Sequence, residues 1–253
     1  MTKLYFDCVT PEGEAAIVYC AQIRWRGVSL AMGSRLESGE GLTPRTRTVL
    51  GRYKASDATG EWALEHPRLG VEGRWRGRAP SFEQTLYESP EGSVHWHCMQ
   101  PAAQAEVRVG DRILRGEGYA ERLTLSVAPW RLPLQQLRWG RFVAERCSLV
   151  WIDWSGEHHM SLALVDGQPR EFGSATEARV QAAGAELRLD PGTILREGKL
   201  GDTILHSMPS VMRLFPSSVF HVQETKWLSR AFLRTGGAEV PGWAIHELVR
   251  WTR

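Results

Sequence analysis

The sequence predicts an all-β protein built from antiparallel strands. Apolar and polar residues alternate with a period of two in many short stretches, which Gly, Pro, Asp or Ser separates from each other. Within residues 15–25, for example, Ile17, Tyr19 and Ile23 share one face of a strand, whereas Gln22 and Arg24 share the other. The further predicted strands are 84–87, 94–99, 105–109, 112–114, 121–127, 147–154, 161–165, 186–189, 218–228 and 243–251.

The number of predicted strands favours two packed halves. About a dozen strands are more than one small barrel accommodates, so we expect two barrel-like halves, residues 1–120 and 121–253, that meet near 115–130. Gly110-Asp111 is typical of a tight hairpin turn. Only 175–185 and 209–215 have a helical pattern, and no internal repeat is visible at the level of residues.

Composition and charge exclude several classes of protein. The chain has 253 residues, 31 Lys and Arg against 29 Asp and Glu, and a net charge of +2, so it lacks the basic field that attracts nucleic acid. It also lacks the long apolar run of an integral membrane segment or a secretion signal. The four cysteines are scattered without C-x-x-C spacing, so we expect buried thiols and a cytoplasmic, reducing location.

One glutamate has the position expected of a catalytic acid. If a strand begins at Tyr119, alternation places Tyr119, Glu121 and Leu123 on the same, mostly apolar face. Loss of hydration on such a face raises the pKa of a carboxyl group, as a general acid near neutral pH requires. In the alternative interpretation Glu121 pairs with an arginine (Arg115, Arg122 or Arg138), or a bulge turns it outward.

Two further acids could take the same role, and each lies in an apolar alternating stretch near the C-terminal end. Glu224 shares a strand face with Val222, and Glu247 alternates with Ile245 and Val249. Acids near strand ends often face solvent or pair with arginine, and both alternatives stay open for these two residues. We include Glu224 among the residues expected to contact substrate.

The chain is rich in tryptophan, with eleven such residues. Large aromatic rings wall apolar cavities, and their negative faces stabilise a developing carbocation. We expect Trp96, Trp139 and Trp227 to line a substrate cavity and most of the other tryptophans to serve packing.

The histidines suggest a polar group in the cavity more than a metal site. His95 and His97 share one face of a strand, but no third ligand follows at a recognisable spacing, so we expect no metal. His97 is instead expected to hydrogen-bond Glu121 or Tyr119. A dinucleotide-binding loop, a phosphate-binding loop and a Gly-x-Ser-x-Gly nucleophile motif are all missing from the sequence.

Several motifs together resemble one family of proteins. They are Tyr5-Phe6-Asp7-Cys8, the run from Trp96-His97-Cys98 to Pro101, Gly116-Glu117-Gly118-Tyr119-Ala120-Glu121, Trp139-Gly140-Arg141, Glu224-Thr225-Lys226-Trp227 and Gly242-Trp243-Ala244-Ile245-His246-Glu247. The chain resembles the lipocalin-like superfamily of carotenoid 1,2-hydratase (hydroxyneurosporene synthase). Tocopherol cyclase and lipocalin-type Diels-Alderases are more distant members.

The resemblance implies two lipocalin-like β domains around an apolar pocket, and chemistry on isoprenoid or polyene substrates by protonation or by shape. It implies no metal and no organic cofactor. The chain departs from the hydratase pattern at one segment, because a Gly-Tyr-His-Asp-His type sequence is replaced by Gly118-Tyr119-Ala120-Glu121-Arg122. Both histidines are missing, whereas an acid is kept.

Two functions of different classes follow from the sequence. In the first, the protein is a hydratase, cyclase or isomerase in which Glu121 is the acid and Tyr119 and His97 orient the substrate. In the second, it is a carrier that holds a hydrophobic small molecule in the same cavity. An enzyme needs Glu121 unpaired and facing the cavity, whereas a carrier tolerates a paired Glu121. Either protein would be a monomer or a homodimer that contacts membranes transiently to acquire its ligand.

Overall fold

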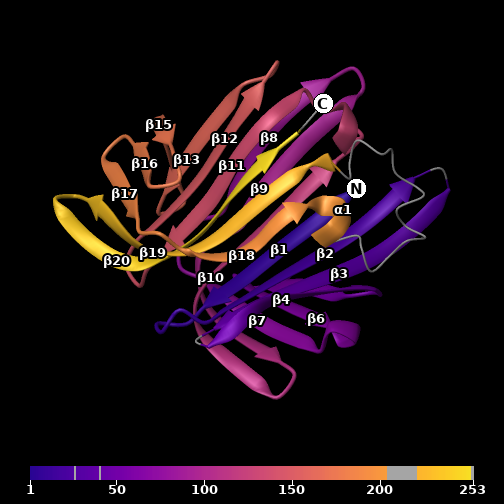
Figure 1. Cartoon of the computed structure of the whole chain (residues 1–253), viewed down its shortest axis with the longest axis horizontal. Coiled ribbons are helices and arrows are strands. Elements are labelled where there is room, and N and C mark those ends of the chain that lie inside the picture. The colour runs from indigo at the N-terminus through magenta and orange to yellow at the C-terminus, as the bar shows by residue number, and fades with distance from the viewer. Residues whose placement is uncertain (26, 40, 204–220, 252–253) are drawn as a thin grey trace.

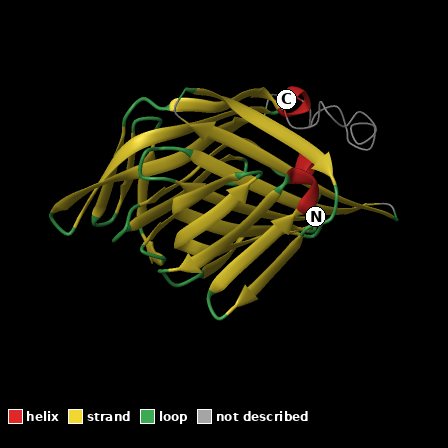
Figure 2. Ribbon diagram, turned by 90° about the horizontal axis from the view of Figure 1, so that it is seen from below, coloured by secondary structure: helices red, strands yellow, loops and turns green. Residues whose placement is uncertain are grey.

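The protein consists of two large antiparallel β-sheets (Figure 1). The computed structural model describes residues 1–25, 27–39, 41–203 and 221–251. Within these residues, strands make up nearly all of the regular structure, and the helical segments are short (Figure 2). The prediction of an all-β, lipocalin-like fold of two packed halves is therefore confirmed.

The first sheet contains the strands from Thr2 to Leu125. Its strands run in the order β4-β3-β2-β1-β10-β9-β7-β6-β5, and β8 pairs with β9. The bounds are β1 (Thr2–Val9), β2 (Ala15–Trp25), β3 (Val28–Gly39), β4 (Leu42–Leu50), β5 (Lys54–Ala58), β6 (Glu61–His66), β7 (Val71–Gly77), β8 (Phe82–Ser89), β9 (Gly92–Val109) and β10 (Arg112–Leu125), with a 3₁₀ turn, η1 (Pro67–Leu69), before β7.

The second sheet contains the strands from Leu134 to Arg250. Its order is β14-β13-β12-β11-β20-β19-β17-β16-β15, and β18 pairs with β19. The bounds are β11 (Leu134–Val143), β12 (Ser148–Gly156), β13 (Met160–Val165), β14 (Gln168–Arg170), β15 (Phe172–Ala175), β16 (Arg179–Ala182), β17 (Ala185–Leu189), β18 (Thr193–Lys199), β19 (Gln223–Thr235) and β20 (Ala238–Arg250), with short helical segments η2 (Pro129–Arg131) and α1 (Leu200–Thr203).

The two sheets have the same topology. Adding ten to each strand number of the first order gives the second order, and the branch strands β8 and β18 correspond in the same way. In each half the first strand pairs with the last strand, β1 with β10 and β11 with β20. The chain therefore repeats one architecture twice, a feature that the amino-acid sequence does not reveal.

Three hydrophobic cores hold these sheets together. Each sheet encloses a core of its own, around Phe6 and Trp75 in the first half and around Phe142 and Trp151 in the second. The third core lies where the halves meet, and residues of both sheets, such as Tyr5 and Ile245, contribute to it. Strand alternation explains this arrangement: in β1, and in β11 after the irregularity at 134–136, odd residues face the shared core and even residues face the separate cores.

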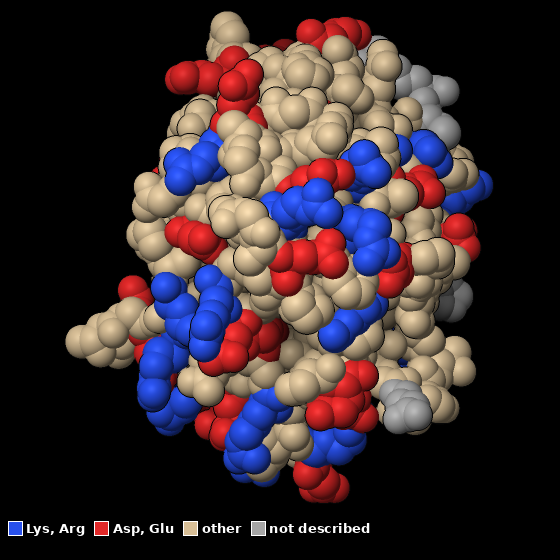
Figure 3. Space-filling view, turned by 90° about the vertical axis from the view of Figure 1, so that its left-hand side faces the viewer, with Lys and Arg blue, Asp and Glu red and all other residues tan. Residues whose placement is uncertain are grey.

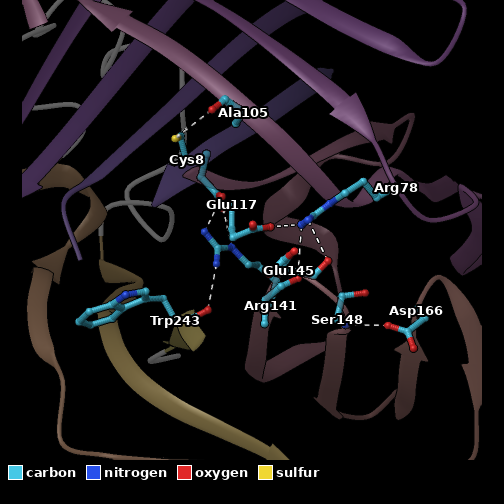
Figure 4. Close-up of polar contacts among 11 residues, drawn as sticks. Cys8, Arg78, Ala105, Glu117, Arg141, Glu145, Ser148, Asp166 and Trp243 are labelled. Atoms are coloured by element: carbon cyan, nitrogen blue, oxygen red, sulfur yellow. Dashed lines mark hydrogen bonds and ion pairs between the residues drawn. The ribbon is translucent and has the colours of Figure 1, made fainter. Parts of the chain in front are cut away.

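A buried ion pair connects the two sheets. Nε and Nη2 of Arg141 on β11 donate to the Asp7 carboxylate on β1 at 2.9 and 2.5 Å, and neither side chain is exposed. Tyr5 donates a third hydrogen bond to Asp7 at 2.8 Å. Arg141 also donates to the carbonyl of Trp243 at 3.2 Å (Figure 4). A charge buried in this way requires its partner, so the pair fixes how the halves meet.

A second arginine joins the halves nearer the surface. Arg78 donates to Glu117 of the first half and to the main-chain carbonyls of Ala144 and Glu145 in the second half (Figure 4). On the outer surface, acidic and basic side chains are intermixed over the face seen in Figure 3. That face presents no large field of one sign, as the near-neutral composition predicts.

The structure confirms some local predictions and overturns another. The hairpin at Gly110-Asp111 connects β9 to β10, with Gly110 at a φ of 58°. The helix expected over 175–185 is wrong, because these residues contribute to β15, β16 and β17. Pairing of β16 with β17 and a turn at Gly184, with a φ of 77°, override the helix propensity of the alanines. The segment 209–215 lies outside the described residues.

Two other expectations concern the boundary between the domains and the state of the cysteines. The sheets separate between Leu125 and Leu134, so residue 120 lies inside β10 of the first sheet; the division into domains 1–120 and 121–253 stays a prediction. All four cysteines are buried and have free thiols.

In the described part of the chain, no helix has the length and apolar character needed to cross a membrane.

Candidate active site

A cavity lies between the two sheets, within the shared core. Its volume is about 390 Å³, and both halves contribute to its wall. Most lining side chains are apolar, among them Ile23, Leu123, Leu134, Ile152 and Val249. The polar lining groups are few, as in typical small-molecule sites. They are Lys3, Tyr19, Ser34, Glu121, Arg196, Glu224 and Glu247.

Glu121 lies on β10 and lines the cavity. Two features of β10 accompany this position: a close approach to the neighbouring strands and an irregular pairing with β9. Gly118 lets β10 approach its neighbours, since a Cβ at this position would lie 2.6 Å from the Cβ of Ala105 and 2.8 Å from the carbonyl oxygen of Asp7. The pairing of β10 with β9 has two irregularities, at 118–120 and 120–121, next to Pro101 of β9. Bulges of this kind are common beside functional sites.

Among the residues that the structure describes, the Glu121 carboxyl group accepts hydrogen bonds from neutral donors only. Trp96 Nε1, Tyr119 Oη and Trp139 Nε1 donate to its Oε2 at 2.6, 2.8 and 3.2 Å. Within the described residues, Glu121 forms no salt bridge. Burial raises the pKa of Glu121 above its ordinary value, although Lys3 and the hydrogen bonds from Trp96 and Tyr119 act in the opposite direction.

The hydrogen bonds also determine where the proton of a neutral Glu121 lies. An indole N–H is a donor only, so Oε2 must act as an acceptor toward both tryptophans. The acidic proton therefore belongs on Oε1, to which none of the described residues donates a hydrogen bond. A carboxyl group held in this way offers its proton from Oε1 while the three donors remain ready to stabilise the carboxylate.

Aromatic rings surround this acid. Trp139 contacts Tyr5 and Tyr119 edge to face, with ring centroids 5.1 and 5.7 Å apart. Gly140 lets Trp151 cover the other face of β11, because a Cβ at residue 140 would overlap the Trp151 ring. Tyr5 and Tyr119 thus hold the ring of Trp139, and its Nε1–H points at Glu121.

A cluster of charged residues occupies another part of the wall, on β18, β19 and β20. Nη2 of Arg196 donates to both Glu224 oxygens, at 2.6 and 2.9 Å. Lys226 pairs with Glu247 and lies 3.7 Å from Glu224. The neighbouring cations hold the pKa of Glu224 below its ordinary value in spite of burial. Unlike Glu121, Glu224 is thus a stable carboxylate.

The structure brings five of the seven expected site residues together. Four of them line the cavity, namely Trp96, Trp139, Glu121 and Glu224. The fifth, Tyr119, donates a hydrogen bond to Glu121. His97 does not join them: it lies next to Trp96 on β9 and faces the other side, where Arg122 and Glu83 are each 3.1 Å from its Nδ1. The expected hydrogen bond from His97 to Glu121 or Tyr119 is therefore wrong.

Trp227 also lies away from the cavity wall. It stacks on His246, with ring centroids 5.0 Å apart, on the face of β19 opposite to Glu224 and Lys226. His246 is hydrogen-bonded to Ser229 at 3.0 Å, and burial lowers its pKa to about 4. This group packs beside Trp151 of the second core.

The histidines and acids do not form a metal centre in the described part of the chain. No cluster of three or more His, Cys, Asp or Glu residues there has metal-binding geometry. His95 contacts the hydroxyl groups of Thr85 and Ser93, each at 2.9 Å.

Sequence reasoning missed several polar groups of this site. Tyr19, Arg196 and Lys226 belong to it, and Asp7 and Arg141 support it from the sheet junction. A signal for Lys226 existed, because it shares a strand face with Glu224 and lies two residues after it. Arg196 has no such signal, since only the pairing of β18 with β19 places it opposite Lys226.

Comparison with known proteins supports the fold and gives no family. No protein-family model matches the chain, and no curated protein sequence matches it. Among solved structures, the chain is similar to CghA with Sch210972 (TM-score 0.64, 9% identity, covering 99% of this chain and 88% of that chain). It is also similar to kievitone hydratase from Nectria haematococca (TM-score 0.59, 10% identity, covering 99% and 89%).

A third similar structure is a presumed AttH protein from Nitrosomonas europaea, with a TM-score of 0.62 and 10% identity over 100% of this chain and 93% of that chain. The similarity extends over most of the length of each of these proteins. At such low identities, the similarity concerns the fold.

Proposed function

We propose that the protein is an enzyme that protonates a hydrophobic substrate in the central cavity, with Glu121 as the acid. The observation that carries the proposal is the environment of Glu121. Its side chain is buried at the cavity wall, its pKa is raised, and its hydrogen-bond partners among the described residues are neutral. A carrier gains nothing from a buried carboxyl group kept free of a cation, whereas a general acid depends on one.

The chemistry follows from the position of the acidic proton. Glu121 Oε1 gives its proton to a carbon of a double bond or to a carbonyl oxygen, and Glu121 becomes a carboxylate. The N–H and O–H donors at Oε2 stabilise this charge. The substrate cation lies among the rings of Trp96, Trp139 and Trp154, which also line the cavity.

The cation can then react in three ways. Addition of water, followed by return of one proton to Glu121, gives hydration. Attack by a second double bond closes a ring and moves the positive charge to another carbon, and loss of a proton from this cyclic cation to Glu121 completes cyclisation. Loss of a different proton from the first cation to Glu121 gives isomerisation. In each case the carboxylate of Glu121 recovers a proton, so the enzyme returns to its starting state.

Two lines of support bear on the class of substrate. The motifs that resemble carotenoid 1,2-hydratase suggest an isoprenoid or polyene, and the apolar lining of the cavity suits such a molecule. Among the proteins with the same architecture, one carries the name kievitone hydratase. We therefore place hydration first among the three outcomes.

The test uses Glu121→Gln, which keeps the shape of the side chain and its acceptor oxygen but has no acidic proton. The wild type and the variant are incubated in D₂O with acyclic and cyclic polyenes, and mass spectrometry measures deuterium on carbon in the products. We expect solvent deuterium in the wild-type product and a loss of turnover of at least a hundredfold in the variant. Glu88→Gln, at an exposed position of β8, is the matched control and should keep full activity.

Turnover that persists in Glu121→Gln would contradict the proposal. Native mass spectrometry separates the two functions further. A co-purifying lipid that both proteins retain equally, without turnover in either, would show that the protein is a carrier.

A further inference from the structure

Four buried donor atoms of cavity-lining residues have no hydrogen-bond partner in the described part of the chain. Trp154 Nε1 is one, and the other three lie together: Nε and Nη1 of Arg196 and the hydroxyl group of Tyr19. Both residues line the cavity, and the Arg196 guanidinium lies 5.5 Å from the centre of the Tyr19 ring. Buried polar groups in native proteins are nearly always hydrogen-bonded, because an unpaired one destabilises the fold.

The geometry of Arg196 explains why these atoms are left over. Glu224 takes up only one nitrogen, because both of its hydrogen bonds come from Nη2. The N–H groups of Nε and Nη1 are therefore unused. They point in different directions, so each can donate a single hydrogen bond to a carboxylate or another oxygen anion of a ligand. Only 7% of the Arg196 surface is exposed, so the unused donors are buried beside the cavity and have no access to bulk solvent.

The charges around this position favour a negatively charged partner. Arg196 pairs with Glu224, and Lys226 pairs with Glu247. The nearby ammonium group of Lys3 lies 4.9 Å from the centre of the Tyr19 ring and has no ion pair among the described residues. Lys3 lines the cavity, and its charge is not paired with a carboxylate of the described residues, so it favours an anionic group on a ligand.

We propose that the ligand of the cavity is amphipathic, with an acidic oxygen group, a carboxylate or an enolate, bound by Arg196 and Tyr19. This inference rests on the proposed function, which makes the cavity the substrate site, and it adds the class of substrate. The hydrophobic part of the molecule then extends along the apolar wall toward Glu121. Anchoring the acidic end fixes which double bond the Glu121 proton reaches.

The test compares three retinoids that share a ring and a polyene chain. Retinoic acid is anionic, retinol is neutral and polar, and axerophtene is a hydrocarbon. Quenching of tryptophan fluorescence measures their affinities, since Trp96, Trp139 and Trp154 line the cavity. We expect the wild type to bind retinoic acid at least tenfold more tightly than retinol or axerophtene.

Two variants test whether Tyr19 and Arg196 cause the preference for retinoic acid. Tyr19→Phe removes one unpartnered hydroxyl group and keeps the ring. Arg196→Lys keeps the charge that Glu224 requires but loses the two unpartnered guanidinium nitrogens. Each variant should lose most of the preference for retinoic acid, by about tenfold, with the affinity for axerophtene unchanged. Tyr53→Phe, which lies against the core of the first half, is the control and should behave as the wild type.

The outcomes separate this inference from the proposed function. If axerophtene binds as tightly as retinoic acid, or if Tyr19→Phe and Arg196→Lys keep the preference, the acidic anchor is wrong while the cavity remains a ligand site. If no retinoid binds to the wild type, the cavity does not accept polyenes, and the proposed function fails together with the inference. If Arg196→Lys does not fold, Tyr19→Phe decides the question alone.

Discussion

The two halves of the molecule place a glutamate at the same position of the same architecture. Glu121 on β10 lies opposite Tyr5 of β1, and Glu247 on β20 lies opposite Trp139 of β11. Both glutamates line the central cavity. In each half, therefore, the last strand presents an acid beside an aromatic residue of the first strand.

The neighbouring strand makes the two acids different. On the other side of Glu121, β9 presents Cys98, whereas at the corresponding position beside Glu247, β19 presents Lys226. Lys226 pairs with Glu247, whereas the described partners of Glu121 are all neutral hydrogen-bond donors. The comparison teaches that one cross-strand neighbour decides whether this position holds an acid with a raised pKa or half of an ion pair.

The largest expected effect comes from replacing Lys226, whose pairing with Glu247 makes the second half different from the first. Lys226→Met leaves Glu247 without its buried partner and should lower the free energy of unfolding by about 3–5 kcal/mol. Denaturant unfolding measures the change. The double variant Lys226→Met/Glu247→Gln should recover a large part of it, since no unpaired carboxylate remains.

Lys54→Met is the control for this experiment. Lys54 forms an exposed pair with Glu65, and its loss should change the stability by less than about 1 kcal/mol. Equal effects of Lys54→Met and Lys226→Met would show that the buried pair is not what sets the second half apart.

A smaller effect distinguishes the buried acids by their response to pH. The raised pKa of Glu121 means that its stabilising contribution is complete below its ordinary value of 4.5 and is lost as the pH rises through the raised pKa. The lowered pKa of Glu224 has the opposite consequence: its contribution is complete above 4.5 and is lost as the pH falls through the lowered pKa.

Unfolding of the variants at pH 4 to 8 tests these opposite slopes. As the pH rises, Glu121→Gln should gain stability relative to the wild type, by up to about 1.4 kcal/mol per pH unit. Glu224→Gln should lose stability relative to the wild type over the acidic part of the range and then remain level. Parallel curves for the two variants would refute the contrast between the acids.

The smallest effects concern the two indole donors of Glu121. Each hydrogen bond favours the carboxylate, so its loss should raise the pKa of Glu121 further. We expect a larger upward shift for Trp96→Phe, whose hydrogen bond is 2.6 Å long, than for Trp139→Phe, at 3.2 Å. Infrared difference spectra of the carboxyl stretch, assigned with Glu121→Gln, measure both shifts. Trp62→Phe, in the first core, should shift nothing.

Strand alternation explains how much of the site was predictable. A period of two predicts that Tyr119 and Glu121 share one face, and in the structure Tyr119 donates a hydrogen bond to Glu121. Trp96 is expected at the cavity because of its large ring, and it lines the cavity. Alternation excludes His97 from the cavity, because it directly follows Trp96 on one strand. The all-β fold followed from alternation and turn residues together.

Register and long-range pairing explain what could not be predicted. Nothing local in the sequence indicates that Arg196 lies opposite Lys226, or that Arg141 reaches Asp7 across the sheet junction. The repeated architecture is hidden for a similar reason. Its corresponding segments, Tyr5-Phe6-Asp7 and Trp139-Gly140-Arg141, share positions but no residue.

The ion pair at the junction has a consequence for the order of synthesis. The first sheet is complete once β10 ends at Leu125, yet the guanidinium that Asp7 requires and one of the two indoles that donate to Glu121 arrive only with β11. We therefore expect the nascent first half to remain loosely packed until the second half emerges. A gene split within residues 126–133 should give two fragments that regain a working site only when they are produced together.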